Sequence, residues 1–217
     1  MSSFRQLMMK KKGGGSPIPA RYTVVDYIES NGNQYIDTGL STTVGFRFVG
    51  TILILYSSNY DYHMLCGSHE LSSPYKRNFI GFHPSLYITI GIGNGDKITS
   101  KTFSTNQYYD VDLSNVYTNY YAKVDNNTET LINGSSSISN SYSSRNLFLF
   151  ANNNISSGAS QYFKGKMKES QIYINNELVA DYVPVYDTVT QKYGMYDKVS
   201  QTFKGNLGSG DFSGGND

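Results

Sequence analysis

The sequence lacks several features on which small proteins depend for stability or membrane insertion. It contains no tryptophan and one cysteine, and charged residues make up only 16% of its 217 positions. Because a lone cysteine cannot form an intrachain disulfide, a disulfide-stabilised scaffold is excluded. Cys66 lies in the apolar run HMLCGS, which predicts a buried, unreactive thiol. No apolar run approaches the roughly 18–20 residues of a membrane-spanning helix, so we expect no membrane partner.

Residues that favour strands and turns are abundant instead. The chain has 20 tyrosines, 11 phenylalanines and 21 glycines, together with many serines, asparagines and threonines. This composition favours short β-strands joined by turns. Hydrophobic residues make up 38% of the chain, which is enough to form a core. The length suits one large β domain with an additional arm.

The first 20 residues differ from the rest in charge. Residues 1–21 carry five basic and no acidic side chains, so 13 of the 18 basic residues and all 17 acidic residues lie in the remainder. Phe4, Leu7 and Met8 fall on one face of a helix, and a flexible glycine-rich joint and a stiffer proline spacer follow. The apolar patch is too short for a secretory signal.

We interpret residues 1–20 as an arm that docks on an acidic protein surface. A tail without fixed structure is the alternative. The few charges and the near absence of aromatic residues argue against nucleic acid as a partner. The predicted contact residues of the arm are Phe4, Arg5, Leu7, Met8, Lys10, Lys11 and Lys12.

From Tyr22 onward, about twelve predicted strands follow at intervals of about 8–12 residues, with no amphipathic helix between them. This pattern predicts an all-β sandwich of two antiparallel sheets. TVVDYIES and QYIDTG flank Asn31-Gly32, a strong turn signal, and Asn175-Asn176 predicts a hairpin. Gly50 suggests a β-bulge within GFRFVGTILILY. The apolar run LFLF (147–150) predicts the middle of a sheet that is covered on both faces.

Five ordered motifs carry a resemblance to a known family: YTVVDYIESNGNQYIDTG, LFLFANNN, FKGKMKESQIYINNELVADYVPVYD, YGMYDKVSQTFKG and GSGDF. Residues 21–214 resemble the concanavalin A-like, or laminin-G-like, jelly-roll domains that are common in tailed-phage structural proteins and gut-bacterial surface proteins. The leader FRQLMMKKKGGG resembles, less specifically, the basic leaders of such domains in phages of gut Bacteroidales. We therefore divide the chain into an anchoring arm (1–20) and a jelly-roll domain (21–217).

The resemblance implies that the first strand lies beside the last ones, so that the two ends of the domain close the sandwich and cover edge strands. Asp37, Thr38 and Gly39 would end a strand in a turn bonded by side chains.

The resemblance also implies a virion protein without enzymatic activity, such as a capsid decoration or a head or tail fibre. Such a protein is assembled in the host cytoplasm and released by lysis, and it would bind other virion proteins through residues 1–20. A carbohydrate-binding module or adhesin of a bacterial surface protein is the alternative.

The carboxylates do not follow the pattern of a glycosidase. Related β-sandwich glucanases carry Glu-x-Asp-x-x-Glu on one strand, which places the carboxylates on one face. None of the five glutamates in this chain begins such a pattern. Asp110 and Asp112 alternate along one predicted strand, and we interpret them as a solvated face. We therefore expect no enzyme.

No cofactor is expected either. His63 and His69 flank Cys66, but the second cysteine pair of a zinc site is missing. Residues 91–95 are interpreted as a hairpin turn, because no lysine-serine pair follows as in a phosphate loop. A structural calcium ion is left open, since no loop has the spacing of a known calcium loop. The loop candidates for calcium are Asp61, Asp96 and Asp125.

Loop tyrosines beside asparagines supply the groups that bind sugars, since aromatic faces stack on sugar rings and amides bond to hydroxyl groups. Most of the tyrosines must be ordinary strand surface, and the sequence does not select among them. The expected ligands are cell-surface or mucin glycans. The candidate ligand-binding residues are Tyr60, Tyr62, Tyr75, Asn78, Tyr117 and Tyr120.

Overall fold

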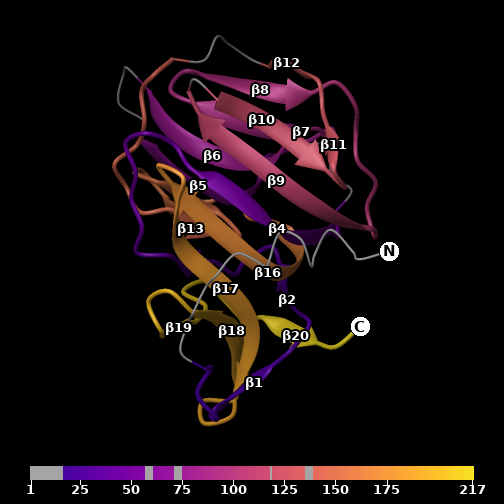
Figure 1. Cartoon of the computed structure of the whole chain (residues 1–217), viewed down its shortest axis with the longest axis vertical. Coiled ribbons are helices and arrows are strands. Elements are labelled where there is room, and N and C mark those ends of the chain that lie inside the picture. The colour runs from indigo at the N-terminus through magenta and orange to yellow at the C-terminus, as the bar shows by residue number, and fades with distance from the viewer. Residues whose placement is uncertain (1–16, 57–60, 71–74, 118, 135–138) are drawn as a thin grey trace.

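The computed structural model describes residues 17–56, 61–70, 75–117, 119–134 and 139–217. Within these ranges the chain forms 20 strands in two sheets that pack face to face (Figure 1). None of the described segments forms a helix that could cross a membrane. The predicted all-β sandwich is confirmed, whereas Tyr60 and the predicted arm contacts from Phe4 to Lys12 lie outside the described residues.

The larger sheet has eleven strands. Eight lie side by side in the order β11 (Asn127–Thr128), β10 (Asn119–Val124), β9 (Tyr108–Val116), β4 (Arg47–Ile54), β16 (Lys164–Ile174), β17 (Glu177–Asp187), β18 (Lys192–Asp197) and β19 (Thr202–Lys204). The other three are β1 (Tyr22–Val24), which pairs with β17, β2 (Tyr27–Asn31), which pairs with β16, and β20 (Ser213–Gly215), which pairs with β2.

The smaller sheet has nine strands. Seven lie in the order β12 (Leu131–Asn133), β8 (Gly95–Thr99), β7 (Ile88–Ile92), β6 (Lys76–Phe82), β5 (His63–Glu70), β13 (Phe148–Leu149) and β3 (Ile36–Asp37), and β14 (Asn152–Asn154) and β15 (Gly158–Ser160) extend it. All pairs are antiparallel except β14 with β5. The sequence predicted about twelve strands, because strands of two or three residues carry no periodicity.

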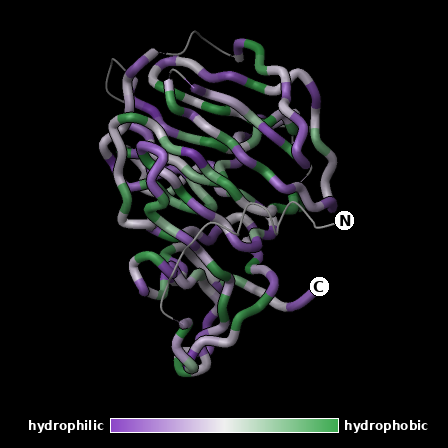
Figure 2. The backbone as a smooth tube through the Cα atoms, viewed as in Figure 1, coloured by the Kyte–Doolittle hydropathy of each residue, from purple (hydrophilic) through white to green (hydrophobic). Residues whose placement is uncertain are grey.

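Hydrophobic and hydrophilic residues alternate along many strands (Figure 2). The hydrophobic ones form the core between the two sheets. Phe46, Phe48, Phe82 and Phe163 are among its fully buried side chains, and each contributes about 1.5–3 kcal/mol by burial. The run LFLF (147–150) is buried throughout, and β13 within it has strands on both sides. The predicted burial of this run is therefore confirmed, but β13 lies next to the last strand in the order of the sheet and not at its middle.

The two ends of the domain meet, as the resemblance implied. Strand β2 pairs with β20 near the C-terminal end and also with β16. The turn at Asn31-Gly32, however, does not form a hairpin, because β2 belongs to the larger sheet and β3 to the smaller one. Gln34 is fully buried at this crossing, where its side-chain oxygen accepts hydrogen bonds from Ser30 and Asn31.

Two predicted turns are confirmed. The Gly39 backbone N–H donates to the Asp37 carboxylate at 2.8 Å, and the Thr38 hydroxyl donates to the Leu147 carbonyl at 2.7 Å, so side chains end strand β3. Asn175 and Asn176 have φ angles of 53° and 63°. This left-handed pair matches the twist of the β16–β17 hairpin.

The predicted bulge at Gly50 lies on the neighbouring strand. Between the pairs Met167–Ile52 and Ser170–Gly50, strand β16 contains one residue more than β4. A side chain at position 50 would crowd the bulge, since an added Cβ would lie 3.0 Å from the Ser170 Cβ. The glycine thus marks the position that faces the bulge.

The interpretation of Asp110 and Asp112 as a solvated face is wrong for Asp112. This side chain is only 5% exposed, and both of its oxygens accept hydrogen bonds from Arg47, at 2.7 and 2.9 Å. The Tyr121 hydroxyl adds a third bond at 2.9 Å, and Thr51 donates to Asp110 at 2.6 Å. From the sequence pattern we expected the Asp112 carboxylate to be exposed. In the structure it is buried, and Arg47 neutralises its charge.

Strand β17 continues beyond the sandwich into a lower part, where β1, β18, β19 and β20 gather (Figure 1). Val183, Val185 and Tyr196 form a second apolar cluster there, and Ile18 packs against it. Arg21 donates two hydrogen bonds to the buried carboxylate of Asp187, at 3.1 and 2.6 Å. Residues 17–21 are therefore fixed to the body, although we had assigned most of them to the arm.

The contacts of residues 17–21 predict how the protein responds to truncation and to acid. Removing residues 1–16 should leave the melting temperature nearly unchanged, whereas Arg21→Met should lower it at pH 7. The Arg21 guanidinium holds the pKa of Asp187 well below its usual range, so this stabilisation is complete above about pH 4 and is lost as the pH falls further. Thermal unfolding from pH 7 to pH 3 should show the deficit of Arg21→Met shrinking below about pH 4, and a deficit that grows there would contradict this account.

Candidate functional site

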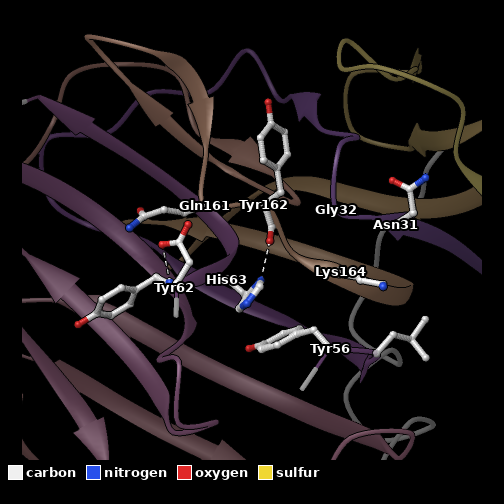
Figure 3. A pocket seen from close by; sticks show the side chains of 10 residues that line it. Asn31, Gly32, Tyr56, Tyr62, His63, Gln161, Tyr162 and Lys164 are labelled. Atoms are coloured by element: carbon white, nitrogen blue, oxygen red, sulfur yellow. Dashed lines mark hydrogen bonds between the residues drawn. The ribbon is translucent and has the colours of Figure 1, made fainter. Parts of the chain in front are cut away.

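A pocket of about 460 Å³ opens at one end of the sandwich. It lies where β2 and β4 end and where β5 and β16 begin, so segments far apart in the sequence meet there (Figure 3). Its lining residues combine aromatic rings with amide, ammonium and carboxylate groups. They are Asn31, Gly32, Leu55, Tyr56, Asp61, Tyr62, His63, Gln161, Tyr162 and Lys164.

Tyr56 and His63 stack on each other at the centre of this pocket, with ring centroids 3.4 Å apart. Tyr56 is only 5% exposed, and Phe163 packs edge-on against it from the core. Burial raises the pKa of Tyr56 far above its usual range, so its hydroxyl stays protonated. That hydroxyl has no hydrogen-bond partner among the described residues.

The His63 ring has a fixed tautomer. Its Nδ1 lies 2.8 Å from the Tyr162 carbonyl oxygen (Figure 3), which can only accept, so Nδ1 carries the hydrogen. Burial lowers the pKa of His63, which keeps the imidazole neutral at pH 7. Nε2 is then a hydrogen-bond acceptor, and in the described part of the chain it has no partner.

The sides of the pocket carry groups that bond to hydroxyls. Gln161 accepts a hydrogen bond from Asn152 at 3.0 Å, which leaves its NH2 group as a donor. Asn31 and Lys164 lie on the opposite side of His63 from Gln161 and Tyr62 (Figure 3). Together these groups can both donate and accept hydrogen bonds around a polar ligand.

The sequence-predicted ligand residues do not form one site. Tyr62 lines the pocket. Tyr75 and Tyr117 are 47% and 38% exposed on other parts of the surface, and Tyr120 packs against the core. Asn78 is fully buried, where it accepts a hydrogen bond from Asn115 at 2.6 Å. Asn78 therefore supports the core, and we leave it out of the proposed site.

The sequence analysis did not select His63, Gln161 or Tyr162 as ligand residues. His63 is the first residue of β5, and Gln161 and Tyr162 lie just before β16. Nothing in their local sequence distinguishes them from other polar residues at strand ends. Gln161 has a φ of 52°, which is uncommon for a residue other than glycine. This left-handed backbone conformation of Gln161 is known only from the folded chain.

The described residues contain no group of three or more His, Cys, Asp or Glu side chains that could hold a metal ion. Cys66 is fully buried, as predicted, and burial raises the pKa of its thiol. Of the calcium candidates, Asp96 is buried in β8, and Asp125 accepts a hydrogen bond from the Asp110 N–H. Asp61 lines the pocket.

No protein-family model matches the sequence, and no curated protein matches it. Among solved structures, the chain is similar to a crystal structure of a protein from Bacteroides ovatus that is described as a candidate carbohydrate-binding protein. The TM-score is 0.57 and the identity 15%, and the match covers 89% of this chain but only 61% of the other. At this identity the likeness shows a shared β-sandwich fold alone.

Proposed function

We propose that this protein is a non-catalytic glycan-binding β-sandwich and that the pocket beside Tyr56 and His63 is its sugar site. The observation that carries the proposal is the pocket itself, where aromatic rings lie beside amide, hydroxyl and ammonium groups. Sugars present apolar C–H faces to aromatic rings and many hydroxyls to polar groups. The fold shared with the protein from Bacteroides ovatus supports the same function.

The lining of the pocket favours binding over catalysis. The usual glycosidase mechanism needs two carboxyl groups on opposite sides of the scissile bond. Asp61 is the one carboxylate among the described lining residues. The neutral His63 ring also lines the pocket, with its Nε2 buried. This set of groups can recognise hydroxyls without protonating a leaving group.

The test is a glycan-binding measurement with variants of the pocket wall. We expect the double variant Gln161→Ala/Lys164→Ala to bind its glycan at least about 10-fold more weakly, because each lost hydrogen bond contributes about 0.5–1.5 kcal/mol. A glycan array would identify the ligand, and isothermal titration calorimetry would measure the affinity.

Tyr117→Ala provides the control, since Tyr117 is an exposed tyrosine that does not line this pocket. We expect its affinity to equal that of the unaltered protein. Loss of binding in Tyr117→Ala, with no loss in the double variant, would place the sugar site elsewhere. An array without any signal would reject glycan binding altogether.

We propose further that residues 1–20 tether this domain to a virion, as the resemblance of the sequence implies. The basic and acid-free composition of residues 1–21 supports a tethering role. Deleting residues 1–12 should abolish attachment while the sandwich stays folded. Mass spectrometry of purified particles would test the location, and absence of the protein from virions would reject it.

A further inference from the structure

Arg77 differs from the other arginines in the described residues in how its charge is balanced. Arg21 and Arg47 each donate two hydrogen bonds to a carboxylate. Arg145 donates from two nitrogens to the Asn153 side chain, at 3.2 and 2.9 Å. Arg77 donates only from Nε, to the Gly93 carbonyl at 2.6 Å. Its two terminal nitrogens have no hydrogen-bond or ion-pair partner within the described residues.

The Arg77 side chain is held in place on the outer side of the smaller sheet. Its guanidinium lies over the Phe79 ring, 5.5 Å from the centroid. The Phe79 ring in turn lies against Gly91, where an added Cβ would come within 2.1 Å of it. Because the Nε bond and the ring fix the guanidinium, its free nitrogens form a preorganised pair of donors.

Two further side chains complete the surroundings of Arg77. His69 is its direct partner across strands β5 and β6, and the His69 Nε2 is buried without a partner among the described residues. The Tyr75 ring lies 6.3 Å from the His69 ring and is 47% exposed. An aromatic surface therefore stands beside a cation, as in sites that bind charged sugars through both groups.

A half-buried cation without a directly bonded carboxylate among the described residues is unusual, since buried charges are normally paired. Burial lowers the pKa of Arg77, and the carboxylate of Asp96 offsets this only in part. Along β5, the partner of Arg77 is His69, six residues from His63 in the pocket wall, which is about 20 Å of extended strand. The pocket and Arg77 can therefore contact different parts of one chain-like ligand.

We propose that Arg77, flanked by Tyr75 and His69, binds the carboxylate or sulfate group of an acidic sugar. This inference rests on the proposed glycan-binding function and names the class of glycan. The planar fork of a guanidinium matches the two oxygens of either anion. A part of the same oligosaccharide several units away would occupy the pocket.

The experiment compares three probes: an oligogalacturonate, which carries carboxylates, a sulfated galactan oligosaccharide, and a neutral galactan oligosaccharide. Calorimetry would measure each against the unaltered protein, Arg77→Met, Arg77→Lys and Arg145→Met. We expect Arg77→Met to bind the preferred acidic probe about 10- to 100-fold more weakly and the neutral probe unchanged. Binding of the acidic probe should also weaken with added salt.

The controls separate loss of recognition from loss of structure. Arg145→Met removes another arginine without a carboxylate partner, and it should leave the affinity for all three probes unchanged. Arg77→Lys keeps the charge but not the fork, so its affinity should lie between those of Arg77→Met and the unaltered protein. If Arg77→Met does not fold, the loss in Arg77→Lys decides the question.

The two proposals fail in different ways. An acidic probe that binds Arg77→Met and Arg77→Lys as tightly as the unaltered protein would overturn the role of Arg77 and leave glycan binding intact. If Arg77→Met loses affinity equally for the acidic and the neutral probes, the role of Arg77 is also overturned, because an equal loss indicates a structural effect. If the unaltered protein binds none of the three probes and the glycan array also gives no signal, both proposals are overturned.

Discussion

Replacing Phe163 with alanine is expected to lower the free energy of unfolding by about 3–5 kcal/mol, the usual loss for a buried aromatic side chain. Phe163 is fully buried, and its ring contacts Tyr56, Phe82 and Phe150 at centroid distances of 6.5, 6.2 and 6.2 Å. Since Phe163 supports Tyr56 from beneath, the same change should weaken glycan binding.

Urea unfolding, followed by circular dichroism, would measure the loss in Phe163→Ala. Phe163→Leu serves as the matched control, because it keeps most of the apolar volume and should cost less than Phe163→Ala. A loss below about 1 kcal/mol in Phe163→Ala would mean that the ring is not part of a close-packed core. The packing of Phe163 beneath Tyr56 would then be contradicted.

Arg47→Met is expected to cost about 2–4 kcal/mol, because it leaves the buried carboxylate of Asp112 without a cation. The Tyr121 hydroxyl would still donate to Asp112, and Arg47 is itself 31% exposed, so the loss should stay below that of a fully buried pair. Thermal and urea unfolding at pH 7 would measure it.

The double variant Arg47→Met/Asp112→Leu tests the reason for that loss. If the unpaired charge causes it, the double variant should be more stable than Arg47→Met alone, since both charges are then removed. Equal or lower stability of the double variant would show that Arg47 acts through the packing of its side chain against Tyr173, whose ring centroid lies 4.9 Å from the guanidinium.

The sandwich could be predicted because its signals are local. The alternation of apolar residues, the Asn175-Asn176 turn and the side-chain-bonded turn after Asp37 are all set by neighbours in the sequence. The pairing of the chain ends came from the resemblance of ordered motifs. The contacts of Ile18 and Arg21 could not be predicted, because their partners lie in β17 and β18, far away in the sequence.

The pocket and the pairing of charges could not be predicted in the same way. The pocket forms only when the ends of β4 and β16 in one sheet meet the start of β5 in the other. This brings together Tyr56, His63 and Tyr162. The strand pattern shows that Asp110 and Asp112 share a face, but it does not show that Arg47 covers one of them. The lack of a directly bonded carboxylate at Arg77 among the described residues likewise appears only when its neighbours are known.

Glycan binding in the pocket is the central claim, and a crystal structure of the complex with the best ligand from the array tests it most directly. We expect a sugar ring beside Tyr56 and His63, with its hydroxyls within reach of Gln161 and Lys164. A sugar bound on any other surface, with this pocket holding only solvent at saturating ligand, would contradict the claim.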